Sequence, residues 1–372
     1  MRKMLQNNNH YQILFYIAFF SPLLGISGLW FVIMSFSIIY AFYVNKHRKI
    51  GFPELILTIL FILCAIIKLF HFCDISIWFP TIKYYMGIGI VICFLYLLDI
   101  VIDVNKLIIA LNIEIFIEAI LINTVLPANY LPNYPDLDYL ITTGPIARVY
   151  SVGCNASKTA TILTMLLSYR EIMRMNRFVA DNRIIEVISF ISIIVLGSGV
   201  GFLLYILYLI FKYQLLRMRY IIFCMILMYF LFQFSKSISM NQDSIFQRFS
   251  YEYFEYILDY KKLQIDYLIQ EYNVSNKIFG STLKNVDDPI IWGDFAWIEY
   301  YISIGLFGIV VFLLTIYKYI NNMNWFPVFI GILGAFHYGG IFSLPGQMVF
   351  AYVLLLNKKT LFHYSLVQSN WQ

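Results

Sequence analysis

One segment of the chain has the residue types needed to bind a phosphate. It precedes a predicted helix and reads Gly144-Pro-Ile-Ala-Arg148-Val-Tyr150-Ser-Val-Gly153-Cys-Asn155-Ala-Ser157-Lys-Thr. The N-terminus of a helix offers unbonded N–H groups and a positive dipole end to an anion. Arg148 adds a planar fork of donors that suits a phosphate. The segment therefore predicts a phosphate-binding corner, although an interfacial arginine that reaches lipid headgroups would have the same surroundings.

A second arginine, Arg248, lies in the longest polar segment, residues 237–293. Tyrosine recurs there at positions 251, 253, 256, 260, 267 and 272, and residues 257–272 have helical character. Aromatic rings with a polar tip suit partly hydrophobic sugar rings at a wet interface. An aromatic belt at a membrane surface has the same composition, and Arg248 would then be a topological anchor.

Two further residues are candidates for proton transfer. His337 follows a short apolar stretch, and Asp294 stands at the start of a long one. Imidazole is the side chain best suited to proton transfer near neutral pH. Each residue also has a structural interpretation, because a lone histidine often ends a span and an aspartate often caps a helix.

Glu114 and Glu118 are spaced four residues apart within an apolar stretch. This spacing puts both carboxylates on one helix face, and ionisable groups at such depth avoid lipid. We expect the pair to point into the bundle interior or a water-filled cavity. The chain has no P-loop, G-x-S-x-G, H-E-x-x-H or C-x-x-C motif. We therefore expect chemistry from scattered residues, with no metal, no cofactor and no nucleic-acid partner.

The elements that must position these residues are apolar. The chain is 61% hydrophobic and 13% charged, so much of its surface must face lipid. We predict an all-α, polytopic membrane protein in which residues 1–372 form one domain. The twelve predicted spans are residues 11–26, 28–44, 54–70, 84–102, 107–126, 156–168, 184–196, 202–213, 220–234, 295–317, 325–336 and 346–356.

The distribution of lysine and arginine predicts the topology. Basic links at residues 46–49, 170–183 and 212–219 lie on one side only if Gly197-Ser-Gly-Val-Gly201 separates two short spans. Short cytoplasmic loops collect Lys and Arg, so we place this side and both termini in the cytoplasm. Residues 11–26 lack a cleavage pattern and read as an uncleaved anchor. The outer segments are then residues 127–155, 237–293 and 337–345.

Three of these features resemble the Wzy-type O-antigen and capsule polymerases, which are related to the O-antigen ligases. The stretch from Arg148 to Ser157 looks like the arginine, glycine and Asn/Glu-Pro-Ser stretch of that family. Residues 197–201 look like its Ser-rich break between two short spans. Residues 294–308 look like its segment that returns into the membrane with a G-x-x-G helix. The order and the sidedness of these features carry the resemblance.

The resemblance implies a GT-C-like glycosyltransferase in the bacterial inner membrane. It would join polyprenyl-diphosphate-linked oligosaccharide repeat units on the periplasmic face and release polyprenyl diphosphate. Arg148 and Arg248 would bind the diphosphate, with Tyr150 and Asn155 in the same substrate-binding stretch. His337 or Asp294 would be the base. The expected partners are the lipid-linked glycan, the bilayer and a separate chain-length regulator.

The chain departs from the family at two positions. Gly199 follows Ser198 where many relatives have arginine or lysine, and Asp294 stands where ligases carry histidine. An O-antigen ligase therefore remains an alternative. A flippase for lipid-linked oligosaccharides is another, because Glu114 and Glu118 would suit a transport path, although a flippase would not need so long an outer segment.

Overall fold

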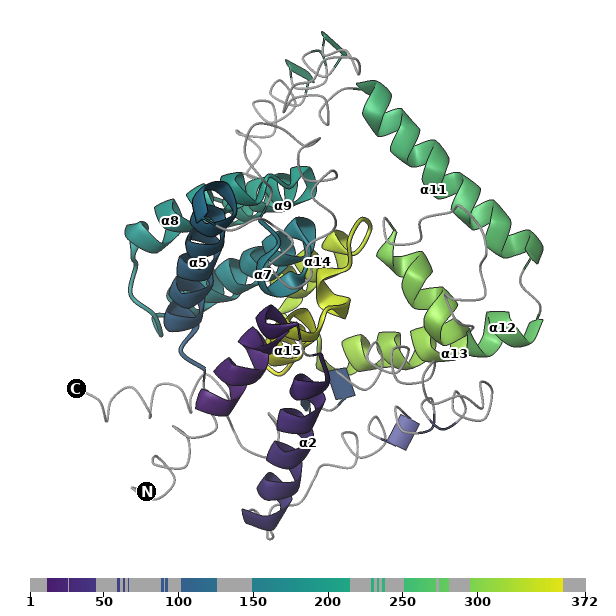
Figure 1. The fold of residues 1–372 in the computed structure, drawn as a ribbon, viewed down its shortest axis with the longest axis horizontal. Coiled ribbons are helices and arrows are strands. Elements are labelled where there is room, and N and C mark those ends of the chain that lie inside the picture. The colour runs from purple at the N-terminus through teal and green to yellow at the C-terminus, as the bar shows by residue number, and fades with distance from the viewer. Residues whose placement is uncertain are drawn as a thin grey trace.

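The computed structural model describes residues 12–25, 27–44, 102–125, 149–214, 251–271, 274–280 and 295–356, with a few isolated positions between them. All regular elements in these ranges are helical, which confirms the all-α class (Figure 1). A helix at residues 12–20 leads into the first short turn, and the labelled helices are α2 (Ser27–Val44), α5 (Val104–Ile120), α7 (Ala156–Met175), α8 (Arg183–Leu196), α9 (Gly199–Lys212), α11 (Tyr251–Glu271), α12 (Val274–Phe279), α13 (Ala296–Tyr319), α14 (Trp325–Gly334) and α15 (Leu344–Leu354). Short turns are η1 (Ser21–Leu24), η2 (Leu121–Val125), η4 (Ser151–Gly153) and η8 (Gly340–Phe342).

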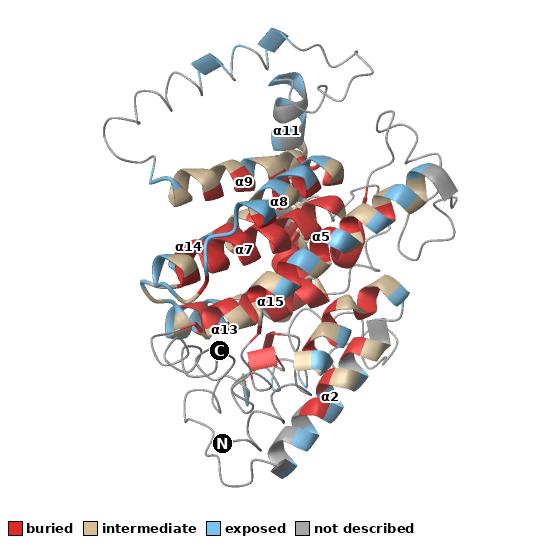
Figure 2. Ribbon diagram, turned by 90° about the vertical axis from the view of Figure 1, so that its left-hand side faces the viewer, coloured by how far each residue is buried: buried red, intermediate tan, exposed pale blue. Residues whose placement is uncertain are grey.

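Helix α7 lies at the centre of the fold. It contacts α5, α8, α9, α14 and α15, and almost all of its residues are buried (Figure 2). Several of these buried residues are polar, and their hydroxyls bond to carbonyls one turn earlier, as Thr161, Thr164 and Ser168 do. Such bonds satisfy a hydroxyl without a partner from another helix. A polar helix can therefore occupy the core.

Helix α7 is also longer than the sequence predicted. It continues to Met175, past the predicted end at residue 168. Arg170 and Glu171, which we had assigned to a basic link, are in the helix and fully buried. The predicted basic link at residues 170–183 is therefore wrong at its start, because hydrogen-bond and ion-pair partners allow Arg170 and Glu171 to stay inside the fold.

The predicted break between two short helices is confirmed. Gly197 ends α8 in the left-handed conformation, with φ of 59°, and Ser198 caps α9 by accepting from the N–H of Gly201 at 3.0 Å. A Cβ atom on Gly201 would lie 2.3 Å from the Cβ of Ala160, so glycine allows α9 to approach α7 closely. Each helix has 14 residues and is therefore about 21 Å long.

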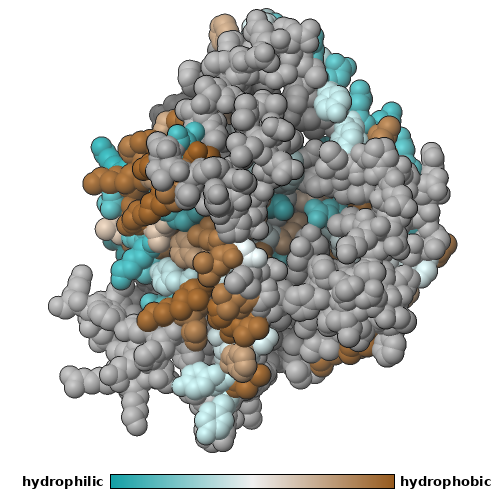
Figure 3. All heavy atoms as spheres, in the orientation of Figure 1, coloured by the Kyte–Doolittle hydropathy of each residue, from teal (hydrophilic) through white to brown (hydrophobic). Residues whose placement is uncertain are grey.

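The outer faces of several helices are apolar, whereas the central helix α7 carries several buried polar residues. Figure 3 shows apolar side chains gathered on the side of the molecule where α5 and α8 lie. The exposed large residues include Ile109, Ile113, Ile117 and Ile120 on α5, Ile184, Val187, Phe190, Ile191 and Ile194 on α8, and Leu306, Val310, Leu313, Leu314 and Tyr317 on α13. Of the described helices, α13 is long and apolar enough to cross a bilayer by length and composition.

The end of α12 meets a kink in α13. Gly305, inside α13, has a φ of 64°, and Gly280, just after α12, has a φ of 78°. A Cβ atom on Gly305 would lie 2.3 Å from the carbonyl oxygen of Ile278, so only glycine fits this backbone contact. The predicted span 295–317 is thus a bent helix. The helical character predicted for residues 257–272 is confirmed by α11, which runs along the periphery (Figure 1).

Candidate functional site

A loop and two helix ends form what we call the polar corner, which comprises residues 149–159 and 198–201 together with Glu114 and Glu118. Glu118, buried near the end of α5, accepts hydrogen bonds from the backbone N–H groups of Tyr150 and Ser151 at 2.9 and 3.0 Å. The hydroxyl of Ser151 donates to Glu114. The two carboxylates therefore point into the bundle, as their spacing predicted, and both hold the same loop.

The loop at the polar corner has the backbone geometry of an anion-binding nest. Tyr150 is in the right-handed helical region and Ser151 is in the left-handed region with φ of 53°. Successive residues of these two kinds point their N–H groups to one side, where an anion binds. Here the anion is the carboxylate of Glu118.

Two helices begin side by side at the polar corner. Asn155 caps α7 by accepting from the N–H groups of Ser157 at 2.9 Å and Lys158 at 3.4 Å. The hydroxyls of Ser157 and Ser198 are 2.8 Å apart, and Ser198 caps α9. The positive dipole ends of both helices therefore add at one place. A Cβ atom on Gly199 would meet nothing within 4 Å, so the first turn of α9 borders open space.

The loop that carries His337 lies against the same end of α7. The backbone oxygen of His337 accepts from the N–H of Ala296 at 2.9 Å, which ties this loop to the start of α13. A Cβ atom on Gly340 would lie 2.9 Å from the carbonyl oxygen of Lys158. The side chain of Lys261, from α11, donates to the carbonyl of Phe336 at 2.7 Å. Segments distant in sequence thus meet beside the polar corner.

Three of the predicted site residues lie in the described part of the chain, and all three are at this end of the bundle. The main chain of Tyr150 is held by Glu118 and by Thr159, whose hydroxyl donates to its carbonyl at 2.6 Å, and Tyr150 is 8% exposed. The side-chain oxygen of Asn155 is occupied by the cap. His337 is half-buried, and its ring packs on that of Tyr338. Their roles toward substrate stay predictions.

The other three predicted site residues, Arg148, Arg248 and Asp294, lie outside the described residues. Arg148 immediately precedes the described loop, and Asp294 is two residues before the start of α13.

Sequence reasoning did not select Glu118, Ser198 or Lys158 as site residues. Each had a signal in the sequence: a carboxylate pair in an apolar stretch, a serine before glycine at a helix break, and a lysine just after an N-cap. Lys158 is half-buried on the first turn of α7 and has no ion-pair partner among the described residues.

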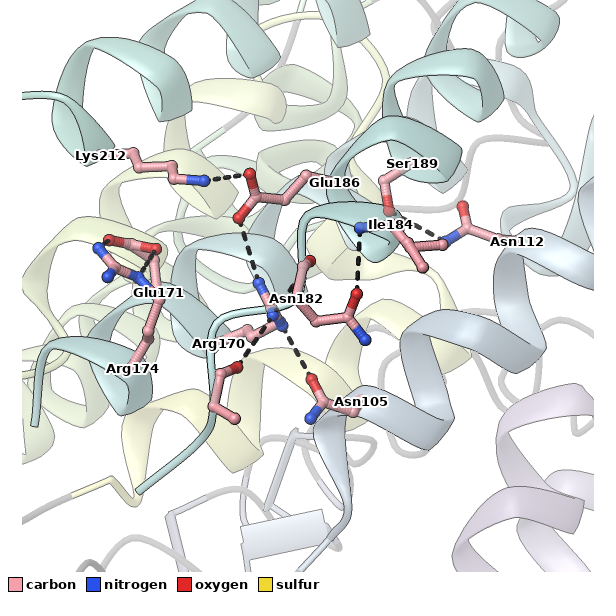
Figure 4. Close-up of polar contacts among 11 residues, drawn as sticks. Asn105, Asn112, Arg170, Glu171, Arg174, Asn182, Ile184, Glu186, Ser189 and Lys212 are labelled. Carbon is pink, nitrogen blue, oxygen red and sulfur yellow. Dashed lines mark hydrogen bonds and ion pairs between the residues drawn. The ribbon is translucent and has the colours of Figure 1, made fainter. Parts of the chain in front are cut away.

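The opposite ends of the same helices meet in an ionic cluster (Figure 4). Arg170 is fully buried and donates to Asn105 at 2.8 Å and to Glu186 at 3.4 Å. Glu186 also pairs with Lys212. Buried charges are stable only when they are paired and hydrogen-bonded. This cluster joins α5, α7, α8 and α9 at the end where the predicted basic links lie.

Glu171 and Arg174 form a second pair in the ionic cluster. Their hydrogen bonds, which use both carboxylate oxygens, raise the pKa of the Arg174 guanidinium and keep it charged.

In comparisons with known proteins, no protein-family model, curated protein or solved structure matches this chain.

Proposed function

We propose that the chain is a polytopic protein of the bacterial inner membrane, with about twelve spans and both termini in the cytoplasm. The exposed isoleucine and leucine faces of α5, α8 and α13 support this proposal, because such faces suit lipid better than water. The buried polar side chains of α7 support it as well, since polar groups within a membrane face the bundle interior. The ionic cluster would mark the cytoplasmic end.

We further propose that the protein is a glycosyltransferase that polymerises surface polysaccharide. Its substrates would be oligosaccharide repeat units linked to polyprenyl diphosphate. A hydroxyl oxygen of the acceptor chain attacks the anomeric carbon of the donor's reducing-end sugar, and the bond from that carbon to the diphosphate oxygen breaks. The electron pair leaves with polyprenyl diphosphate, and the hydroxyl proton passes to a base, His337 or Asp294.

The observation that carries this proposal is the convergence at the polar corner. The N-termini of α7 and α9, the half-buried Lys158 and the loop of His337 lie at one end of the bundle. Donors fixed in advance where negative charge develops stabilise a transition state strongly. A departing diphosphate develops such charge, and Arg148 and Arg248 would supply further donors. Diphosphate is already a competent leaving group, so this step requires no metal.

Deleting the gene in its own host and running the surface polysaccharide on a gel tests the proposal. A polymerase predicts that the long ladder is replaced by single-repeat caps, because export and ligation continue. Unsubstituted core, with repeat units left on the lipid carrier, would instead indicate a ligase or a flippase. The membrane face on which that material accumulates separates these two. An unchanged ladder would contradict all three functions.

A further inference from the structure

Glu118 has an unusual set of partners for a buried carboxylate. It lies at the end of α5 and accepts two consecutive backbone N–H groups, from residues 32 and 33 positions later in the chain. Glu114, one turn earlier, accepts from the Ser151 hydroxyl. One helix face thus holds one loop by three hydrogen bonds.

The loop needs this support because its backbone is strained. Ser151 and Cys154 both have φ of 53°, a region that residues other than glycine rarely adopt. Each such residue costs on the order of 1 kcal/mol or more, and it persists only where its surroundings enforce it. Glu118 accepts from the N–H groups of Ser151, which is one of the two strained residues, and of Tyr150, which precedes it. Thr159 fixes the same loop from α7, since its hydroxyl accepts from Gly153 at 3.0 Å.

The carboxylate also affects where another anion can bind. The N–H groups of Tyr150 and Ser151 are already bonded to Glu118, so these two donors are not available to a diphosphate. The anion is therefore directed to the donors that remain at the polar corner, which are the first turn of α9 beside Gly199 and the side chain of Lys158.

We infer that Glu118 is a positioning residue of the diphosphate site: its carboxylate fills the nest at residues 150 and 151 and thereby fixes the conformation of residues 149–155, up to the cap of α7. This inference rests on the proposed function. Glu118 does not contact substrate in this account. It acts through the loop, and a misplacement of about 1 Å in such a loop can lower a rate roughly 10²-fold.

The test compares Glu118→Ala with Glu118→Gln in purified, membrane-reconstituted protein supplied with lipid-linked repeat units. Glutamine keeps a carbonyl oxygen that can accept both N–H groups, whereas alanine leaves them unbonded. We expect Glu118→Ala to lower kcat about 10²-fold per inserted molecule, with little change in KM. Glu118→Gln should keep most of the activity. Asn112→Ala is the matched control, because Asn112 is also buried on α5 and bonds to Ser189 at 2.9 Å, away from the polar corner.

A second variant separates positioning from simple misfolding. Glycine adopts the left-handed conformation without strain, so adding Ser151→Gly to Glu118→Ala should restore part of the lost kcat. Three results would overturn the inference: wild-type kcat in Glu118→Ala, equal defects in Glu118→Ala and Glu118→Gln, or no recovery in the double variant. If the wild-type protein itself forms no polymer, the proposed function fails. If the wild-type protein polymerises and Glu118→Ala has the same kcat, only the positioning role is contradicted.

Discussion

The polar corner and the ionic cluster lie at opposite ends of the same four helices. The partners that the structure shows for buried charged side chains differ between the two. In the ionic cluster, side chains neutralise side chains: Glu186 lies between Arg170 and Lys212, and Glu171 binds Arg174. At the polar corner, the carboxylate of Glu118 accepts hydrogen bonds from the backbone N–H groups of Tyr150 and Ser151.

This difference separates a site built for stability from one suited to a ligand. The ionic cluster has matched its donors to acceptors within the protein, so its residues gain little by meeting an anion. The polar corner combines two helix N-termini with a half-buried lysine beside open space. Substitutions at one end of the bundle, compared with substitutions at the other end or with an exposed control, test this contrast.

The largest expected effect is on stability. Arg170→Ala removes the fully buried guanidinium that donates to Asn105 and Glu186. Breaking a buried ion pair by removing one partner costs about 3–5 kcal/mol. Thermal unfolding of the purified protein in detergent measures this loss. Polymerisation per folded molecule should stay near the wild-type level. A stability equal to that of the exposed control Arg183→Ala would mean that the ionic cluster does not hold the helices together.

The next effect is on activity. Arg148→Ala and Arg248→Ala should each lower polymerisation by about 10²–10³-fold, by analogy with the removal of one donor to a developing negative charge. Both variants should insert into the membrane in normal amounts. The measurement is the polysaccharide ladder of a deletion host complemented with each variant, with Arg183→Ala as the control. Normal ladders from both arginine variants would contradict the proposal that Arg148 and Arg248 bind the diphosphate.

The smallest expected effect is that of removing one helix cap, and two caps can be compared. Ser198 caps α9 at the polar corner, and Asn182 caps α8 at the ionic end. Replacing either by alanine should cost about 0.5–2 kcal/mol of stability. Ser198→Ala should in addition slow polymerisation about three- to tenfold, which corresponds to one net hydrogen bond. Equal activities per inserted molecule in the two variants would count against a special role for the corner.

The sequence predicted the helices well where signals are local. Asn155 and Ser198 precede their helices as N-caps, and Gly197 supplies the left-handed residue that ends α8. Such signals depend on a few neighbouring residues, so the break between α8 and α9 could be placed from the sequence alone.

Features that depend on distant partners could not be predicted. Arg170 reads as part of a loop because its partners Asn105 and Glu186 are far away in the sequence. The kink at Gly305 depends on the approach of residues 278–280, which the G-x-x-G pattern does not indicate. For the same reason Glu118 could be placed in the bundle interior but not matched to the loop at Tyr150, because their contact exists only in the folded chain.

The most direct test of the central claim uses the purified protein in liposomes with lipid-linked repeat units and no other protein or nucleotide. If the proposed function is right, oligomers of increasing length form on the lipid carrier, one polyprenyl diphosphate is released for each new linkage, and Arg148→Ala lowers the rates of both about 10²–10³-fold. Repeat units that cross the bilayer without forming any new glycosidic bond would contradict it.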